Sequence, residues 1–368
     1  MWMRETYLES RTVLPNSGER TTDIRLTDPI SAIAIEVRCT NGSTDNKANL
    51  LAACISSIEV IDGSDVLYSL DGYEAEAFTA YFLKAMQFSI WSEAGSTVQS
   101  LLAIIPFGRF LGDQQYALDP LRFTNLQVRI NWNIAAVRAV AVTAFATGTC
   151  TLTVVPYVMM GARKPIGLIT AKEIYSWVTV SGSTEYIDLP TDNTYLGIMY
   201  RATKAATAPI TVINNVKIHA NQEAITLFNL RGSDLVRQMS LNYPEFQYRH
   251  LFSQVDAGTI YNVLKQSEVP VFTVISPEDT VLTYNNYGYG EGVVEVNSAG
   301  SANSSACSFM AYTHGRCPHA CIWVPFGDYS DPDQWLPADT FRSLRAEMGS
   351  GSSSGSGYIV AVQSRLYK

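Results

Sequence analysis

The chain has 368 residues, of which 47% are hydrophobic and only 16% are charged, and its formal net charge at pH 7 is −8. At roughly 100–200 residues per domain this length allows two or three domains, and the abundance of aromatic residues excludes a disordered chain. The 26 Lys and Arg residues are dispersed without a run, so no direct, sequence-specific binding of nucleic acid is expected. The low share of charge predicts that partners cover much of the surface.

The sequence carries no sign of a membrane span or of a disulfide framework. The longest apolar stretch, Ile134–Phe145, contains Arg138 and falls short of the roughly 18 apolar residues that a span requires. The N-terminal MWMRETYLES lacks the apolar core of a signal peptide, so synthesis and retention in the cytoplasm are expected. The six cysteines are too sparse for a disulfide scaffold and are expected to be small buried residues.

The chain repeats itself, beginning with its first expected strands. Residues 7–38 and 174–201 each read as a strand, a Ser-Gly turn, a second strand, a Pro/Asp break and a third strand. At one spacing of 163 residues their apolar positions match; these are Ile24 with Ile187, Ile33 with Leu196 and Ile35 with Ile198. Residues 54–72 and 212–232 follow in the same order, each as two alternating strands joined by a polar turn and ending at a glycine.

Two further matches continue this order to the end of the chain. In the first of them, Pro106-Phe107-Gly108 matches Pro325-Phe326-Gly327, and Gln115-Tyr116 matches Gln334-Trp335. After a shift of one residue, Leu118, Phe123 and Leu126 match Leu336, Phe341 and Leu344. The run TCTLTVVPYV then closes the first half as GYIVAVQSR closes the second. Four blocks in one order indicate two copies of one domain.

These matches predict an all-β fold of two tandem jelly-roll β-sandwich domains, residues 1–165 and 166–368, each with one short helix. Short runs that alternate at period two between Gly, Pro, Asn and Asp are typical of sandwich strands. The helices are expected at 72–88 and 232–240, after the matched glycine of each copy. The second copy has about 60 additional residues, rich in Tyr, Asn, Ser and Gly, which predicts a surface loop or small strand subdomain at about 241–320.

This architecture resembles the double jelly-roll major capsid proteins of tailless icosahedral viruses, a family that includes those of adenoviruses and membrane-containing bacteriophages. The resemblance covers the whole chain through its duplication, and the hairpin IEVIDGSDVLYSLDG before an Ala-rich helix is similar to capsid proteins of small bacterial viruses. It implies that two jelly rolls stand side by side, that three chains close into a pseudo-hexagonal capsomer, and that insertions form outward towers. It also implies a place in the virion after synthesis and assembly in the host cytoplasm.

The partners that the resemblance implies are copies of the same chain, first in a homotrimer and then in neighbouring capsomers. Permanent interfaces are large and apolar, which would account for the low charge. The N-terminal arm, with Trp2 and Arg4, is a candidate contact for a neighbouring capsomer, a minor capsid protein or an internal viral membrane. A frayed end is the alternative for this arm.

The best candidate metal site is formed by Cys317, His319 and Cys321. On a strand these side chains would share one face, and thiolate with imidazole suits zinc. The repeat places Val98, Ser100 and Leu102 at the equivalent positions, and two of these are expected to be ordinary core residues. The two cysteines are therefore expected to fill core positions, and no metal, catalytic residue or cofactor is predicted.

The sequence thus favours a structural, non-enzymatic protein, the major capsid protein of an icosahedral virus. The alternative is a carbohydrate-binding or glycan-hydrolysing protein of two β-sandwich domains, in which the Tyr-rich insertion supplies rings for sugar stacking. A bicupin-type enzyme would need a His-x-His pair, which the sequence lacks.

Overall fold

The computed structural model describes residues 1–43, 46, 49–84, 94–135, 144–204, 207–255, 260–263, 266–275, 282–286, 292–296 and 307–367. Their side chains are described as well, except those of residues 250–309, 311 and 313. These residues are mainly β-strands arranged in five sheets. The helices within them are all too short or too polar to cross a membrane.

The N-terminal part of the chain forms two antiparallel sheets. Its strands are β1 (Trp2–Glu5), β2 (Glu9–Val13), β3 (Ser17–Asp23), β4 (Ile30–Thr40), β5 (Ile55–Asp62), β6 (Asp65–Leu70), β7 (Val98–Pro106), β8 (Leu126–Asn133) and β9 (Thr151–Met160), with short helices at Leu51–Cys54 and Pro120–Arg122. One sheet has the order β1-β9-β4-β7, with β2 also paired to β9, and the other has the order β3-β8-β5-β6. Strand β9 shows the sequence pattern that forms these sheets. Most of its residues alternate between buried and half-buried, as a strand with one face on a core requires.

The C-terminal part repeats this arrangement. Its strands are β10 (Gly167–Val178), β11 (Thr184–Leu189), β12 (Thr194–Thr203), β13 (Ile213–Ala220), β14 (Ile225–Arg231), β21 (Cys321–Pro325), β22 (Leu344–Ser350) and β23 (Ser356–Leu366), with helices at α3 (Pro209–Val212), α4 (Gly232–Asn242), Pro332–Gln334 and Ala338–Thr340. The order β10-β23-β12-β21 reproduces β2-β9-β4-β7, and β11-β22-β13-β14 reproduces β3-β8-β5-β6. The predicted all-β fold of two jelly rolls is therefore confirmed, while the boundary at residues 165/166 stays a prediction.

The strand registers correct the three matches predicted at a spacing of 163 residues by two residues each. In the first copy the chain after β7 hydrogen-bonds to the carbonyl of Ser31, and in the second copy the chain after β21 bonds to the carbonyl of Leu196. Leu196 thus takes the place of Ser31, and Ile33 corresponds to Ile198 rather than to Leu196. Because side chains alternate with a period of two, a shift of two residues keeps the same face buried, so the apolar pattern could not reveal it.

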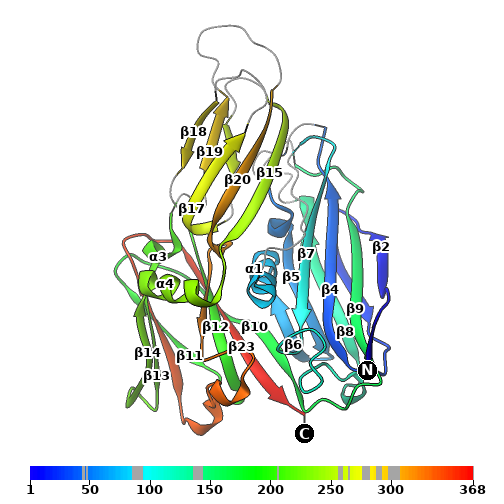
Figure 1. Cartoon of the computed structure of the whole chain (residues 1–368), viewed down its shortest axis with the longest axis vertical. Coiled ribbons are helices and arrows are strands. Elements are labelled where there is room, and N and C mark those ends of the chain that lie inside the picture. Colours follow the sequence, from blue (N-terminus) through cyan, green and yellow to red (C-terminus); the bar gives the residue numbers. More distant parts are fainter. Residues whose placement is uncertain are drawn as a thin grey trace.

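The two copies are joined edge to edge within one sheet. Strand β6 of the first copy lies parallel to β10 of the second, with Tyr68 opposite Ala171 and Ser69 opposite Lys172. This pairing makes a continuous eight-stranded sheet with the order β21-β12-β23-β10-β6-β5-β8-β3. Figure 1 shows the two copies side by side, with β14 and β2 on opposite sides of the molecule.

Helix α1 (Gly72–Leu83) lies between the two copies (Figure 1). It begins at a capping box, in which the N–H of Glu74 donates to the carboxylate of Asp71 and the carboxyl of Glu74 accepts from the N–H of Asp71. It ends at Lys84, which adopts the left-handed conformation with φ of 52°. The helix is therefore shorter than the predicted 72–88, and residues 85–93 lie outside the described residues.

The insertion of the second copy forms small sheets at the end of the molecule opposite the two termini (Figure 1). Its strands are β15 (Phe246–Val255), β16 (Ile260–Val263), β17 (Gln266–Ile275), β18 (Leu282–Asn286), β19 (Gly292–Val296) and β20 (Cys307–Pro318), in the orders β15-β20-β17 and β16-β19-β18. The sequence predicted a loop or a small subdomain of strands, and strands are present. Of the tyrosine rings expected to stack on sugars, those of Tyr243 and Tyr248 are buried, and those of Tyr261, Tyr284, Tyr287 and Tyr289 lie outside the described side chains.

The first residues of the chain are paired rather than free. Strand β1 runs antiparallel to the edge of β9, with Trp2 opposite Met160 and Glu5 opposite Tyr157. The N-terminal arm therefore forms part of the first sheet, and a frayed end is wrong for these residues. Trp2 nevertheless leaves 60% of its surface exposed.

Candidate functional site

The candidate metal ligands Cys317, His319 and Cys321 lie at the tight turn between β20 and β21. Cys317, His319 and Ala320 all have positive φ angles, of 57°, 52° and 61°. These angles are incompatible with an extended strand, so the three candidate side chains do not share one strand face as expected. The local sequence could not show this, because the turn contains no glycine in the positions that favour left-handed backbone.

His319 instead pairs with a carboxylate of the other copy. Its Nε2 lies 2.9 Å from Oε2 of Glu76 in α1, and the two side chains are 2% and 1% exposed. The ring of Tyr73 packs on the imidazole at 5.2 Å between centroids. Burial of both partners makes this a pair that links α1 to the turn before β21.

Cys317 and Cys321 are fully buried members of the main core. Burial raises the pKa of the Cys321 thiol well above its ordinary value, which disfavours the thiolate that a metal needs. Among the described residues, no three His, Cys, Asp or Glu side chains are grouped closely enough to hold a metal ion. The arrangement supports the expected core role of the cysteines, and the absence of a bound metal stays a prediction.

A buried charge network joins the two copies around Arg201 of β12. The guanidinium forms an ion pair with Asp71, the N-cap residue of α1, and its side chain is only 12% exposed. It also lies over the rings of Tyr73 and Tyr358, at 4.6 and 5.0 Å from their centroids. Arg201 thus binds the start of α1 to the sheet of the second copy. No local motif in the sequence signals this residue.

Two further carboxyl groups face the same guanidinium. Burial, and then the charge of Asp71, raise the pKa of Glu74 well above its ordinary value. Burial likewise raises the pKa of Glu173 on β10. The charge of Glu173 also raises the pKa of Glu74, as expected for two carboxyl groups that lie close together. The network therefore holds more protons in the folded chain than in the unfolded chain.

Replacing Glu74 by glutamine should stabilise the chain at pH 8 and leave its stability at pH 4 nearly unchanged. A carboxyl whose pKa is raised on folding stabilises the folded state at low pH, and this contribution is lost as the pH rises above the unfolded value of about 4.5. Glutamine resembles the protonated acid and still completes the capping box. Urea unfolding at both pH values measures the difference.

The matched control for this prediction is Glu223→Gln on an exposed turn, which should not change the pH dependence. A loss of stability in Glu74→Gln that is larger at pH 8 than at pH 4 would contradict the account, because the carboxylate would then be the stabilising form.

A cluster of aromatic rings fastens α1 to the second copy beside this network. Tyr81 of α1 donates a hydrogen bond of 2.7 Å from its hydroxyl to the carbonyl of Cys321. Its ring packs against Tyr243 and Phe246 at 5.2 and 5.8 Å, and against Trp323 of β21 at 6.5 Å. The cluster therefore connects the first copy, the second copy and the base of the insertion through buried apolar contacts.

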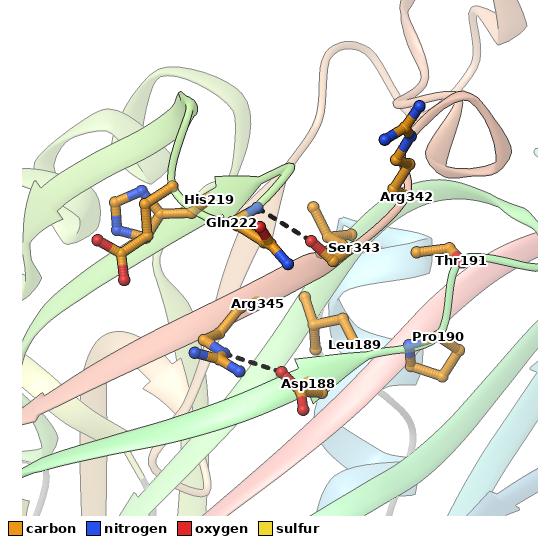
Figure 2. A pocket seen from close by; sticks show the side chains of 11 residues that line it. Asp188, Leu189, Pro190, Thr191, His219, Gln222, Arg342, Ser343 and Arg345 are labelled. Atoms are coloured by element: carbon orange, nitrogen blue, oxygen red, sulfur yellow. Dashed lines mark hydrogen bonds and ion pairs between the residues drawn. The ribbon is translucent and has the colours of Figure 1, made fainter.

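A separate pocket of about 570 Å³ lies in the second copy, between the end of β11, the β13–β14 turn and the start of β22 (Figure 2). Arg345 Nε donates to Asp188 at 2.8 Å, and the N–H of Gln222 donates to the hydroxyl of Ser343 at 3.0 Å. Both positive and negative side chains line it, and its described lining residues include no Phe, Tyr or Trp. The pocket therefore lacks the rings on which a sugar would stack.

The described geometry has clear counterparts among solved structures. The chain is similar to the STIV major capsid protein, with a TM-score of 0.60 and 10% identity over 100% of this chain and 97% of the other. A chain from the atomic structure of Sulfolobus Turreted Icosahedral Virus gives a TM-score of 0.60 and 10% identity, over 99% of this chain and 91% of the other. The major capsid protein P2 from Bacteriophage PM2 gives a TM-score of 0.54 and 8% identity, over 99% of this chain and 98% of the other. No family model and no curated protein matches the sequence.

These comparisons define the class of fold. The chain has the double jelly-roll fold of viral major capsid proteins, over its full length. The resemblance inferred from the duplicated sequence blocks is confirmed at this level. The matched chains come from a Sulfolobus virus and a bacteriophage, so a bacterial host stays a prediction.

Proposed function

We propose that this chain is a viral major capsid protein that self-assembles as trimeric, pseudo-hexagonal capsomers into an icosahedral shell, without catalysis or a cofactor. The observation that carries the proposal is the double jelly roll itself: two copies of one topology joined edge to edge in a single sheet. Three such chains around one axis present six similar sides, and a closed ring leaves no interface between chains unpaired. The two copies correspond to residues 1–165 and 166–368.

Exposed apolar side chains support this function. Large hydrophobic residues that lie open on the described surface include Trp2, Val13, Phe110, Leu121, Val178, Val180, Tyr186, Ile225 and Leu366. They occur on both copies, as expected for a protein whose flanks are covered by neighbours. The proposed location is the virion, after assembly in the host cytoplasm. Binding of a minor capsid protein or an internal membrane by the N-terminal strand is part of this proposal.

Sedimentation of the purified chain tests the proposal. We expect a stable trimer of about 120 kDa, three times the chain mass of 40.5 kDa. A well-behaved monomer that binds oligosaccharides would overturn it and support the alternative of a carbohydrate-active protein. The pocket in Figure 2, whose described lining has no Phe, Tyr or Trp, gives that alternative no support.

A further inference from the structure

The chain contains one complete example of how its two jelly rolls pair. Strand β6 meets β10 in parallel, with Tyr68 opposite Ala171 and Ser69 opposite Lys172. Beside this pairing, Arg365 forms an ion pair with Asp65. We call the contact between the outer edge of β6 and β10 the internal joint. Each side of it has an equivalent elsewhere in the chain, because the two copies share one topology.

The equivalent of β6 is β14, which lies at the end of its sheet. The pairing of β13 with β14 reproduces that of β5 with β6, and the register shifts at the same place in both. The matched residues are Tyr68 with Phe228, Ser69 with Asn229 and Asp65 with Ile225. Strand β6 is largely buried by β10, whereas β14 is largely exposed. Among the described strands, the outer edge of β14 is therefore the unpaired counterpart of one side of the internal joint.

The equivalent of β10 is β1 and β2 together. Strand β10 pairs with β23 and has a register shift before Tyr175. Strands β1 and β2 pair in succession with β9, and the break between them comes before Glu9, at the position equivalent to Tyr175. The matched residues are Trp2 with Leu168, Glu5 with Ala171, Thr6 with Lys172 and Met160 with Arg365. The strand is interrupted where Pro156, which has no N–H, replaces Ala361. In the part of the chain that the structure describes, the outer edge of β1 and β2 pairs with no other strand and is the counterpart of the other side.

The two free edges are chemically complementary. At the internal joint a carboxylate meets a guanidinium, Asp65 with Arg365. At the corresponding positions of the free edges stand Ile225 and Met160, so both charges have been replaced by apolar side chains. Ile225 is 42% exposed, and Trp2, opposite Met160 in its sheet, is 60% exposed. Bringing the edges together would bury these groups against each other.

We propose that the outer edge of β14 in one copy of the chain pairs in parallel with β1 and β2 of the next copy, with Phe228 opposite Glu5 and Asn229 opposite Thr6. The proposal rests on the proposed function, since it supplies the contact between chains of the trimer. Each chain carries both edges on opposite sides (Figure 1), so the contact is head to tail and closes into a ring. The ring then repeats the internal joint at every position.

A pair of engineered cysteines tests this contact. In Thr6→Cys/Asn229→Cys, mild oxidation should join chains to each other, giving covalent dimers and trimers on a denaturing gel. The matched control is Ser69→Cys/Lys172→Cys at the internal joint, which should oxidise within single chains without raising their mass. The unmodified chain under the same oxidant should give neither product, because its described cysteines are buried.

A charge exchange gives an independent readout. Ile225→Asp alone should weaken association of the chains at least tenfold, because it places a carboxylate beside Trp2 and Met160 without a partner. Ile225→Asp/Met160→Arg recreates the pair of the internal joint and should restore most of the association. Leu241→Asp, on the exposed end of α4, is the control and should associate as the unmodified chain does.

The outcomes separate this proposal from the proposed function. A trimer that neither cross-links through residues 6 and 229 nor responds to Ile225→Asp would overturn the contact and leave the capsid function standing. A chain that stays monomeric would overturn both. Cross-linking between chains together with recovery in the charge-exchanged variant would support both.

Discussion

Replacing Arg201 by methionine should lower the free energy of unfolding by about 3–5 kcal/mol, the usual cost of removing one partner from a buried ion pair. Arg201 is the cation that Asp71, Glu74 and Glu173 all face, and it packs between two tyrosine rings. Methionine keeps much of the side-chain length but leaves three carboxyl groups without their counter-charge. The N-cap of α1 loses its anchor on β12 at the same time.

Urea unfolding of the two proteins at pH 7 measures this effect. The matched control is Arg345→Met, which breaks the ion pair with Asp188 in which the two side chains are 45% and 79% exposed. An exposed pair contributes only about 0–1 kcal/mol, so this variant should remain close to the unmodified chain. Equal losses in the two variants would show that burial of the network around Arg201 is not what stabilises it.

Replacing Trp323 by alanine should cost about 3–5 kcal/mol of unfolding free energy, as for other large residues removed from a core. Trp323 is among the largest fully buried side chains. It packs against Tyr81 of α1 and Tyr329, and its ring fills the space beside Gly197, where an added Cβ would lie 2.5 Å from it. Its loss would leave a cavity between α1 of the first copy and the second copy.

Chemical unfolding again gives the measurement, with Tyr186→Ala as the control for loss of an aromatic ring. Tyr186 is 58% exposed, so its removal should change stability by less than about 0.5 kcal/mol. A Trp323→Ala loss as small as that of the control would contradict a close-packed contact between the copies.

The sequence predicted the architecture because duplication made its pattern visible twice. Matches such as Pro106-Phe107-Gly108 with Pro325-Phe326-Gly327 fixed the order of strands, and alternation identified their faces. It could not fix register within a face, which is why Ile33 was paired with Leu196 instead of Ile198. It also gave no indication of which edges meet, because an edge strand that is paired and one that is free can share the same apolar period.

The candidate site was predictable only in part. The burial of Cys317 and Cys321 was expected from the repeat and is observed, although their equivalents Val98 and Leu102 are only half-buried. The left-handed turn around His319 was not expected. The partners of His319 and Arg201 lie far away along the chain, in and before α1, so no local motif could name them. The buried network depends on tertiary contacts between the two copies, and only the structure brings those residues together.

Electron microscopy of the purified assembly, viewed along its axis, tests the central claim most directly. The account predicts a closed particle of three chains with a hexagonal outline and six similar lobes, two from each chain, and three insertions projecting from one end. Isolated particles with two lobes, each of the size of a single chain, would contradict it.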